Sequence, residues 1–332
     1  FVRIVSMQPN ALLAESERLA VVVGALMVLL LAALDQTIVS PALPTIGAAL
    51  GDVDWLAWVV SAYFLTSTAV TPLYGKLADL QGRRPTLYGA VAIFTLGSVI
   101  CALAPSMPIL ILGRAVQGLG GGGLVSLVQT IIGDVVPPQE RAKYMVYIST
   151  VWAVASIGGP LAGGVFAEHM HWSMIFWINL PLAAIAFVMI HRSLRRIPDV
   201  TRPARLDLVG AVSIVAATIA FMLALTWGGN RFAWGSAEIL GLFALSLALG
   251  LFFARHIART EEALVPLEIL RNPVISVVVS ALFFSMGAYV GLSVYMPLWF
   301  ELVAGLHPAS ARFGLLALTL GTAGALVFGA GP

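Results

Sequence analysis

Two charged residues, Asp35 and Arg114, stand inside long apolar stretches of the sequence. Asp35 follows the five apolar residues 30–34, and Arg114 lies near the start of the apolar stretch 108–133. If these stretches lie in a lipid bilayer, a charge at the bilayer centre costs at least about 2.5–3.5 kcal/mol. A charge that is kept there is expected to have a partner or a water-filled cavity. Both residues are therefore candidates for functional chemistry.

Asp35 is the acid best placed for proton chemistry. In a cavity that opens first to one side of a membrane and then to the other, a carboxylate can bind a proton on one side and release it on the other. Other acids before residue 200 fall near the ends of the apolar stretches or between them, among them Asp52, Asp54, Asp134 and Glu168. The alternative is that Asp35 and Arg114 only brace the fold or reach towards the polar boundary.

A second pattern is formed by small residues in the stretch 144–167. Ala155, Gly159 and Gly163 recur at every fourth position, so on a helix they share one face and allow a neighbouring backbone to approach closely. Pro160 and Gly164 add a site where the helix can bend. Ordinary tight packing also uses such a face, and this alternative stays open.

Patterns that would indicate an enzyme or a cofactor site are weak. Residues 118–123 contain a GxGxxG sequence, but it lies inside an apolar stretch and not between a strand and a helix of a soluble βαβ unit. We interpret these glycines as a close-packing face. None of the five histidines has a zinc-ligand spacing, and no nucleophile elbow or other catalytic grouping is recognisable. We expect no enzyme activity, no cofactor and no metal.

The composition places these residues in a membrane protein. Of the 332 residues, 60% are hydrophobic and only 10% are charged, whereas a soluble domain has roughly a quarter charged residues. A bilayer-spanning helix needs about 20 apolar residues. Ten stretches of that size are predicted as helices: 19–45, 55–74, 86–105, 108–133, 144–167, 173–191, 207–227, 236–254, 273–300 and 312–332. The net charge of +2 gives no indication of nucleic-acid binding.

The loops between these stretches predict the orientation. With a cytoplasmic N-terminus, all but three of the 18 Lys and Arg residues fall in cytoplasmic segments, as the positive-inside rule requires. Seven of the eight tryptophans then lie at the outer helix ends, where the amphipathic indole ring is favoured, and only Trp152 lies in mid-helix. We therefore expect a multi-pass protein of the cell (plasma or inner) membrane with its N-terminus in the cytoplasm.

Three regions are expected along the chain. Residues 1–191 form a six-helix bundle, residues 192–271 form a cytoplasmic linker and two inserted helices, and residues 272–332 begin a second, incomplete bundle. The sequence begins with Phe1, without a secretory signal, and stops at Pro332 inside an apolar run. We expect a fragment or a truncated chain.

The segment between the second and third predicted helices combines two glycines, an acid and two arginines: Gly75, Asp79, Gly82, Arg83 and Arg84. With these residues it resembles the signature loop of the major facilitator superfamily. Leu80 stands where the family usually has a basic residue, a departure that weakens one charge contact. The resemblance implies that this loop latches the protein between its conformations on the cytoplasmic side.

Further motifs resemble those of the fourteen-helix drug:proton antiporters. The stretch Leu34–Pro44 is similar to their first-helix motif, and Leu110–Gly118 is similar to the fourth-helix motif associated with proton coupling. Ala155–Gly164 is similar to the antiporter motif of the fifth helix, and His171–Pro181 to the opening of the sixth. The two extra helices predicted after the sixth favour the fourteen-helix branch over the twelve-helix one. The resemblance covers the chain from about residue 18.

The resemblance implies a proton-coupled antiporter that exports hydrophobic, often cationic drugs by alternating access between two bundles. Asp35 would carry the proton or face a cationic substrate, and Arg114 would tune it. The expected partners are a small-molecule substrate, protons and the lipid bilayer, and the pattern is compatible with a monomer. Aromatic and soft side chains of the substrate cavity are predicted at Tyr63, Trp152, Met286, Tyr289 and Tyr295.

Other functions fit the same fold. The first alternative is an exporter of one specific lipid or metabolite that uses the same mechanism. A more distant one is a membrane sensor or scaffold that does not transport, and a membrane enzyme is more distant still. Core packing is also an alternative role for each of the five predicted cavity residues.

Overall fold

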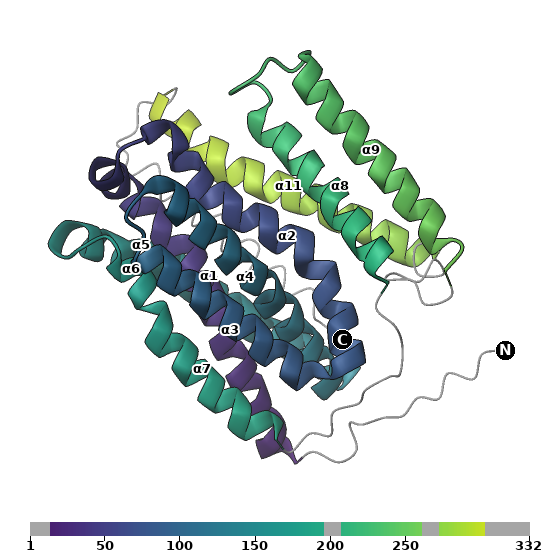
Figure 1. Cartoon of the computed structure of the whole chain (residues 1–332). Helices are drawn as coiled ribbons and strands as arrows, with labels where there is room; N and C mark the ends of the chain where they lie inside the picture. Colours follow the sequence, from purple (N-terminus) through teal and green to yellow (C-terminus); the bar gives the residue numbers. More distant parts are fainter. Residues whose placement is uncertain (1–13, 196–206, 261–271, 303–332) are drawn as a thin grey trace. The chain divides into compact units, whose positions relative to one another are not determined.

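The computed structural model describes residues 14–195, 207–260 and 272–302, which form helices joined by short turns (Figure 1). No β-strand occurs among these residues. The long helices are α1 (Glu15–Leu50), α2 (Leu56–Gln81), α3 (Arg83–Ala102), α4 (Met107–Val135), α5 (Arg141–His169), α7 (Asn179–Leu194), α8 (Leu208–Trp227), α9 (Ala237–Ile257) and α11 (Pro273–Leu302). The short ones are α6 (Met174–Trp177) and the 3₁₀ turns η2 (Val53–Trp55) and η3 (Pro138–Glu140).

The described helices confirm the predicted fold class, an all-α membrane protein. Eight of them are long and apolar enough to span a membrane, with α6 and α7 counted as one span, Met174–Leu194. They correspond to the first eight predicted stretches. The ninth stretch, 273–300, is helix α11, and the tenth, 312–332, lies outside the described residues.

The chain divides into two compact units, residues 1–264 and residues 265–332. Helix α11 is the described part of the second unit. In the first unit, α4 packs against α2 and α3, and α1 packs against α5, α7 and α4. Helices α8 and α9 form an antiparallel pair, and α8 also contacts α2 (Figure 1). The rings of Trp58 on α2 and Trp227 on α8 meet edge to face, with 6.0 Å between the ring centroids.

Glycines of α4 allow it to pack closely between α2 and α3. A Cβ atom added at Gly118 or Gly122 would collide with the backbone of α2, and one added at Gly120 would collide with the backbone of α3. The interpretation of residues 118–123 as a close-packing face is thereby confirmed.

The junction of α2 and α3 is shorter than predicted. The sequence analysis placed residues 75–84 in a loop, whereas α2 continues to Gln81 and α3 begins at Arg83. Leu77, Ala78 and Leu80 are good helix formers, so the helix persists until Gly82. Gly82 has φ 96° and turns the chain in a conformation that a side chain would strain. The loop prediction was wrong in this respect.

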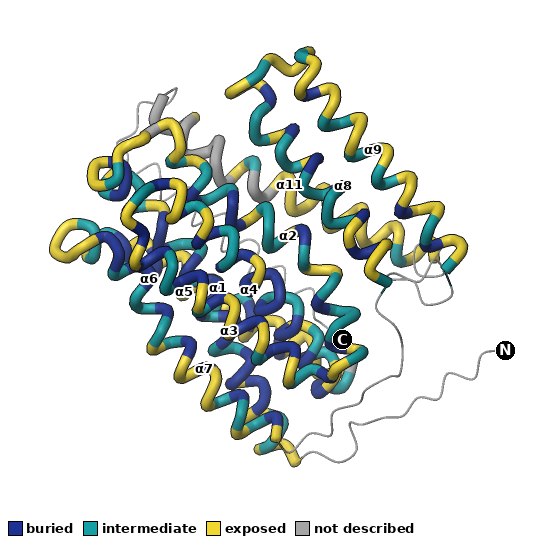
Figure 2. The backbone as a smooth tube through the Cα atoms, viewed as in Figure 1, coloured by how far each residue is buried: buried dark blue, intermediate teal, exposed yellow. Residues whose placement is uncertain are grey.

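Two apolar clusters fill the interior of the first unit. Their residues belong to the buried positions that are dark blue in Figure 2. The large cluster includes the segment of α1 from Val21 to Ala32, with facing residues such as Phe94 and Leu124. The small cluster includes the segment of α1 from Ile38 to Ile46, with facing residues of the other helices. The boundary between the two clusters crosses α1 at residues 33–37, the segment that contains Asp35.

Candidate functional site: a buried polar layer

Five polar side chains lie between the two apolar clusters, and we call them the polar layer. They come from α1, α3, α4 and the start of α7, and each is at most 1% exposed: Asp35, Ser98, Arg114, Gln117 and Asn179. On α1, α3 and α4 the neighbouring apolar residues on one side belong to the large cluster and those on the other side to the small cluster. Around Asn179, the small cluster is represented on α6 and the large cluster on α7. The layer is therefore sealed in this conformation of the bundle.

Asp35 accepts hydrogen bonds on both carboxylate oxygens. Its Oδ2 accepts from Nη1 of Arg114 at 2.7 Å. Its Oδ1 accepts from Nε2 of Gln117 at 2.6 Å and from Nδ2 of Asn179 at 2.8 Å. These three donors surround a carboxylate in the way that its ionised form requires, because an ionised carboxylate only accepts hydrogen bonds.

Arg114 is held by α2 as well as by Asp35. Its Nε donates to the backbone oxygen of Val59 at 2.9 Å, and its Nη1 also donates to Oε1 of Gln117 at 2.7 Å. The guanidinium carbon Cζ lies 4.5 Å from the centre of the Tyr63 ring, within the range of a cation–π interaction. These contacts fix the guanidinium in one orientation, so Arg114 joins α1, α2 and α4.

Ser98 and Asn179 complete the layer. The Oγ of Ser98 lies 2.8 Å from Nε2 of Gln117 and 3.3 Å from Nδ2 of Asn179, and it donates to the backbone oxygen of Phe94. Asn179 is placed by the break between α6 and α7. Pro181 has no N–H for the carbonyl of Trp177, so the helix is interrupted one turn before it.

The sequence analysis assigned a role to two members of the layer and missed the other three. Gln117 lies one helical turn after Arg114, and Asn179 stands alone in an apolar stretch, so both carried a weak signal. Ser98 carried none, because a serine in an apolar helix can satisfy its hydroxyl on the preceding turn, as this one does with Phe94.

The small residues of α5 face α1, two residues along from Asp35. Thr37 donates through Oγ1 to the backbone oxygen of Ala155 at 2.8 Å. A Cβ atom added at Gly159 would collide with Thr37, and one added at Gly163 would collide with the backbone oxygen of Ile38. Pro160 is exposed on another face of α5, and a Cβ atom at Gly164 would meet nothing within 4 Å.

At the opposite end of the bundle from the predicted outer tryptophans, Arg83 joins two acids. Its Nη1 pairs with Asp79 at 2.6 Å, and its Nε pairs with Asp134 at the end of α4 at 2.9 Å. A third ion pair, Arg18 with Glu140 at 3.1 Å, links the start of α1 to the end of η3, directly before α5. Asp134 was not predicted as a member of this site, since the chain places it 55 residues after Asp79.

Gly75 and Arg84 are the remaining residues of the predicted latch. Gly75 lies on α2 with nothing within 4 Å of an added Cβ atom, and Arg84 is half-buried at the start of α3. No ion pair of Arg84 is seen in the described part of the chain.

The predicted cavity residues come from both units of the chain: Tyr63 and Trp152 from the first, and Met286, Tyr289 and Tyr295 from the second. Tyr63 is fully buried against Arg114, and Trp152 is half-buried against the large apolar cluster. Met286 is 60% exposed on α11. The side chains of Tyr289 and Tyr295 lie outside the described residues.

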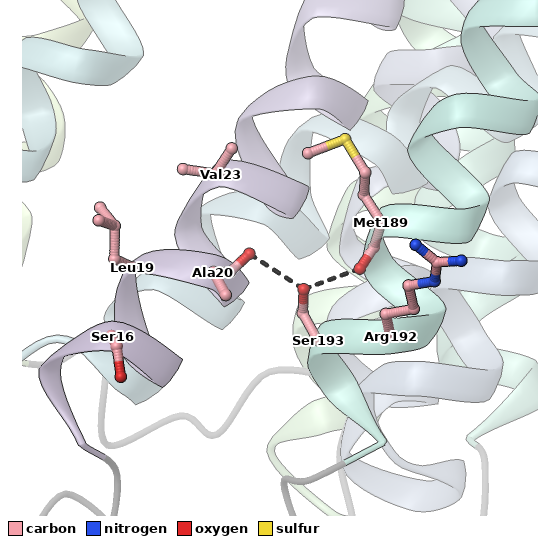
Figure 3. Close-up of a pocket in the computed structure, with 7 residues that line it drawn as sticks. All are labelled: Ser16, Leu19, Ala20, Val23, Met189, Arg192 and Ser193. Carbon is pink, nitrogen blue, oxygen red and sulfur yellow. Dashed lines mark hydrogen bonds between the residues drawn. The ribbon is translucent and has the colours of Figure 1, made fainter.

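A separate open groove of about 430 Å³ lies between the start of α1 and the end of α7. Figure 3 shows the hydroxyl of Ser193 between the backbone oxygens of Ala20 and Met189, to which it donates at 3.0 and 2.7 Å. None of the predicted site residues lines this groove. Over the described ranges, no group of three His, Cys, Asp or Glu side chains is arranged to hold a metal ion.

Comparisons with known proteins show the family. The model of the Major Facilitator Superfamily matches residues 25–332. The multidrug transporter protein MdtP of Bacillus subtilis is 33% identical over 298 residues, which are 90% of this chain and 55% of that protein. The efflux pump dotC of Dothistroma septosporum is 38% identical over 299 residues, or 88% of this chain and 51% of the pump.

Solved structures support the fold alone. The proton:xylose symporter XylE aligns with a TM-score of 0.61 at 13% identity, over 95% of this chain and 69% of that chain. An auto-inhibited POT family peptide transporter aligns with a TM-score of 0.51 at 19% identity, over 74% of this chain and 53% of that chain.

The helical fold and the sequence matches together define the class. The chain belongs to the Major Facilitator Superfamily and is a multi-pass membrane protein with relatives named as multidrug transporters and efflux pumps. It spans about half the length of the curated relatives that it matches.

Proposed function

We propose that this chain is part of a proton-coupled antiporter that exports hydrophobic, often cationic compounds from the cell. The names of its relatives support export and a broad choice of substrates. The extra pair of helices α8 and α9 after the first six spans supports the fourteen-helix branch of the family. The proposed orientation has the N-terminus in the cytoplasm of the cell that exports the compound.

The buried carboxylate of Asp35 is the observation that carries the proposal. It is 0% exposed, and its three hydrogen bonds reach α4 and the start of α7. A proton bound to Asp35 would remove the negative charge that Arg114 faces, and their attraction would weaken. Binding and release of one proton would thus change the strength of a link between helices, as coupling to a conformational change requires.

The other sites have supporting parts in this mechanism. Close contact of α5 with α1 at Gly159 and Gly163 would transmit movement of one helix to the other. Pro160 and Gly164 lie away from the contact with α1, and bending there would let α5 move while that contact is kept. The ion pairs of Arg83 with Asp79 and Asp134 would hold the cytoplasmic side in one conformation and open in the other.

The test is proton-driven export by the complete gene product in liposomes, with a panel of cationic and neutral substrates. Asp35→Asn should abolish proton-driven transport of both kinds, while Asp54→Asn, which changes an exposed acid, should transport normally. Loss of cationic substrates alone would assign Asp35 to substrate binding. Full proton-coupled transport of both kinds by Asp35→Asn would contradict the proposed role.

A further inference from the structure

One polar atom of the layer is left without a partner. Within the described residues, Oδ1 of Asn179 has no hydrogen bond, although the residue is completely buried. Buried amide oxygens almost always accept a hydrogen bond, so one without a partner needs a physical explanation. Its own amide nitrogen, on the same planar group, donates to Oδ1 of Asp35. The amide nitrogen of Asn179 is therefore paired with Asp35, whereas its amide oxygen is unpaired.

The hydrogen-bond donors of Gln117 and Asn179 suit Asp35 only while its carboxylate is ionised. Once a proton sits on Oδ1 of Asp35, that oxygen must donate a hydrogen bond, but the two groups beside it, Nε2 of Gln117 and Nδ2 of Asn179, are donors as well. Two donors that face each other repel. A protonated Asp35 thus needs an acceptor close to the position where Asn179 now presents its nitrogen.

The other members of the layer are poorly suited to be that acceptor. Arg114 has only donors. The Oε1 of Gln117 already accepts from Nη1 of Arg114 and lies 3.8 Å from the sulfur of Cys101. The Oγ of Ser98 already faces both amide nitrogens and gives its own hydrogen to Phe94. Asn179 alone among them has a free acceptor, and half a turn of its amide brings that oxygen to Asp35.

We infer that Asn179 is a positioning residue that turns its amide with the protonation of Asp35, donating to the carboxylate and accepting from the carboxylic acid. The inference rests on the proposed function, since it names the partner of the transported proton. The proton comes from water and forms an O–H bond on Oδ1 of Asp35. The hydrogen bond from Nδ2 of Asn179 breaks, and one to Oδ1 of Asn179 forms. Release of the proton to water reverses both changes, and no other covalent bond is altered.

Infrared difference spectra of the complete gene product, labelled with ¹³C at asparagine side chains, test the turn directly. The 332-residue chain contains four asparagines, Asn10, Asn179, Asn230 and Asn272, and variants at Asn179 and Asn230 identify their bands among all labelled asparagine bands of the complete gene product. Between high and low pH, one labelled carbonyl band should move to lower frequency as the amide oxygen gains a hydrogen bond. The shift should vanish in Asn179→Leu and in Asp35→Asn, and persist in Asn230→Leu, whose residue lies exposed in the turn between α8 and α9.

Transport gives the second measurement. Asn179→Leu keeps the branched shape and the number of side-chain heavy atoms but removes both hydrogen-bonding atoms, so proton-driven export should fall about tenfold, as expected for the loss of a hydrogen bond to a group that is charged in one state. Asn230→Leu should be unchanged. Should Asn179→Leu fail to insert, Asn179→Ser supplies the assignment of the band.

The outcomes separate the inference from the function that it rests on. One outcome is a carbonyl band of the protonated Asp35 carboxyl group that changes with pH, while the band of the labelled asparagine carbonyl does not move. This would overturn the role of Asn179 and leave the role of Asp35 intact. Absence of any Asp35 acid band across the pH range, with transport preserved in Asp35→Asn, would overturn the proposed function itself. A labelled shift that persists in Asp35→Asn would also overturn the inference, because the amide would then be responding to another group.

Discussion

At the scale of single residues, replacing only one member of the ion pair of Asp35 and Arg114 is expected to lower the free energy of unfolding. Arg114 is 1% exposed, and its guanidinium would remain buried without a counter-charge in Asp35→Asn. Removing one partner of a buried pair typically costs about 3–5 kcal/mol. We expect Asp35→Asn and Arg114→Gln each to lower the midpoint of thermal unfolding in detergent.

The double variant separates a structural from a functional role for this pair. Asp35→Asn combined with Arg114→Gln leaves no buried charge, so its unfolding midpoint should lie above that of either single variant. If Asp35 also carries the proton, the double variant should still fail in proton-driven export. Restored export would mean that the pair serves the fold alone.

The polar layer was only partly predictable from the sequence. Charges in apolar stretches are rare enough to point to Asp35 and Arg114 directly. Neutral polar residues carry a weak signal, as Gln117 and Asn179 do, or none where the helix satisfies them locally, as it does for Ser98 through Phe94. That Asn179 meets Asp35 across 144 residues follows from the packing of α1 against α7, which no local pattern contains.

At the scale of helices, the contact of α5 with α1 predicts different effects for two adjacent glycines. In Gly159→Ala the new methyl group collides with Thr37, so the variant should be destabilised by about 1–3 kcal/mol. In Gly158→Ala the methyl group meets nothing within 4 Å, so the better helix propensity of alanine should leave stability unchanged or slightly raised. Unfolding midpoints in one detergent measure both, and equal losses would contradict the importance of the contact with Thr37 for packing.

The two ion pairs of Arg83 predict a loss of transport without a loss of stability. Asp79 and Asp134 are about half exposed, and such exposed pairs contribute only about 0–1 kcal/mol. Asp79→Asn and Asp134→Asn should therefore insert and unfold normally, but impair export if Arg83 holds one conformation. The measurement is export in liposomes alongside the unfolding midpoint.

Glu140→Gln is the matched control for the pairs of Arg83. It breaks the pair with Arg18, which is similarly exposed at the same end of the bundle, but lies outside the motif. We expect it to export normally. If Asp79→Asn and Asp134→Asn export as normally as Glu140→Gln, Arg83 and its partners contribute only to the charge that orients the protein.

The helices themselves were largely predictable, and their ends were not. Length and hydropathy located eight spans, because crossing a bilayer requires about 20 apolar residues. The end of α2 was placed too early and the start of α3 too late, since a helix continues beyond the apolar core until Gly82 breaks it. The break between α6 and α7 at Ile178, one turn before Pro181, was missed because both pieces lie within one apolar stretch.

At the scale of the whole molecule, the orientation proposed from Lys and Arg is testable with the single cysteine replaced. In a Cys101→Ala background, Asn230→Cys in the turn between α8 and α9 should react with an impermeant thiol reagent added to intact cells. Gln139→Cys in η3 should react only after permeabilisation. Both positions are exposed, so labelling in the reverse order would invert the orientation.

The length of the chain leads to the last prediction. Alternating access needs two bundles that move against each other around a central site, and this chain spans 55% and 51% of two relatives that are named as transporters or pumps. The polar layer, by contrast, is built entirely from helices α1 to α7. We therefore expect the 332-residue chain in liposomes to show no proton-driven transport, while a chain of the relatives' length transports. Substantial transport by the short chain would mean that the second bundle is not needed, and the mechanism proposed for Asp35 would have to operate within one bundle.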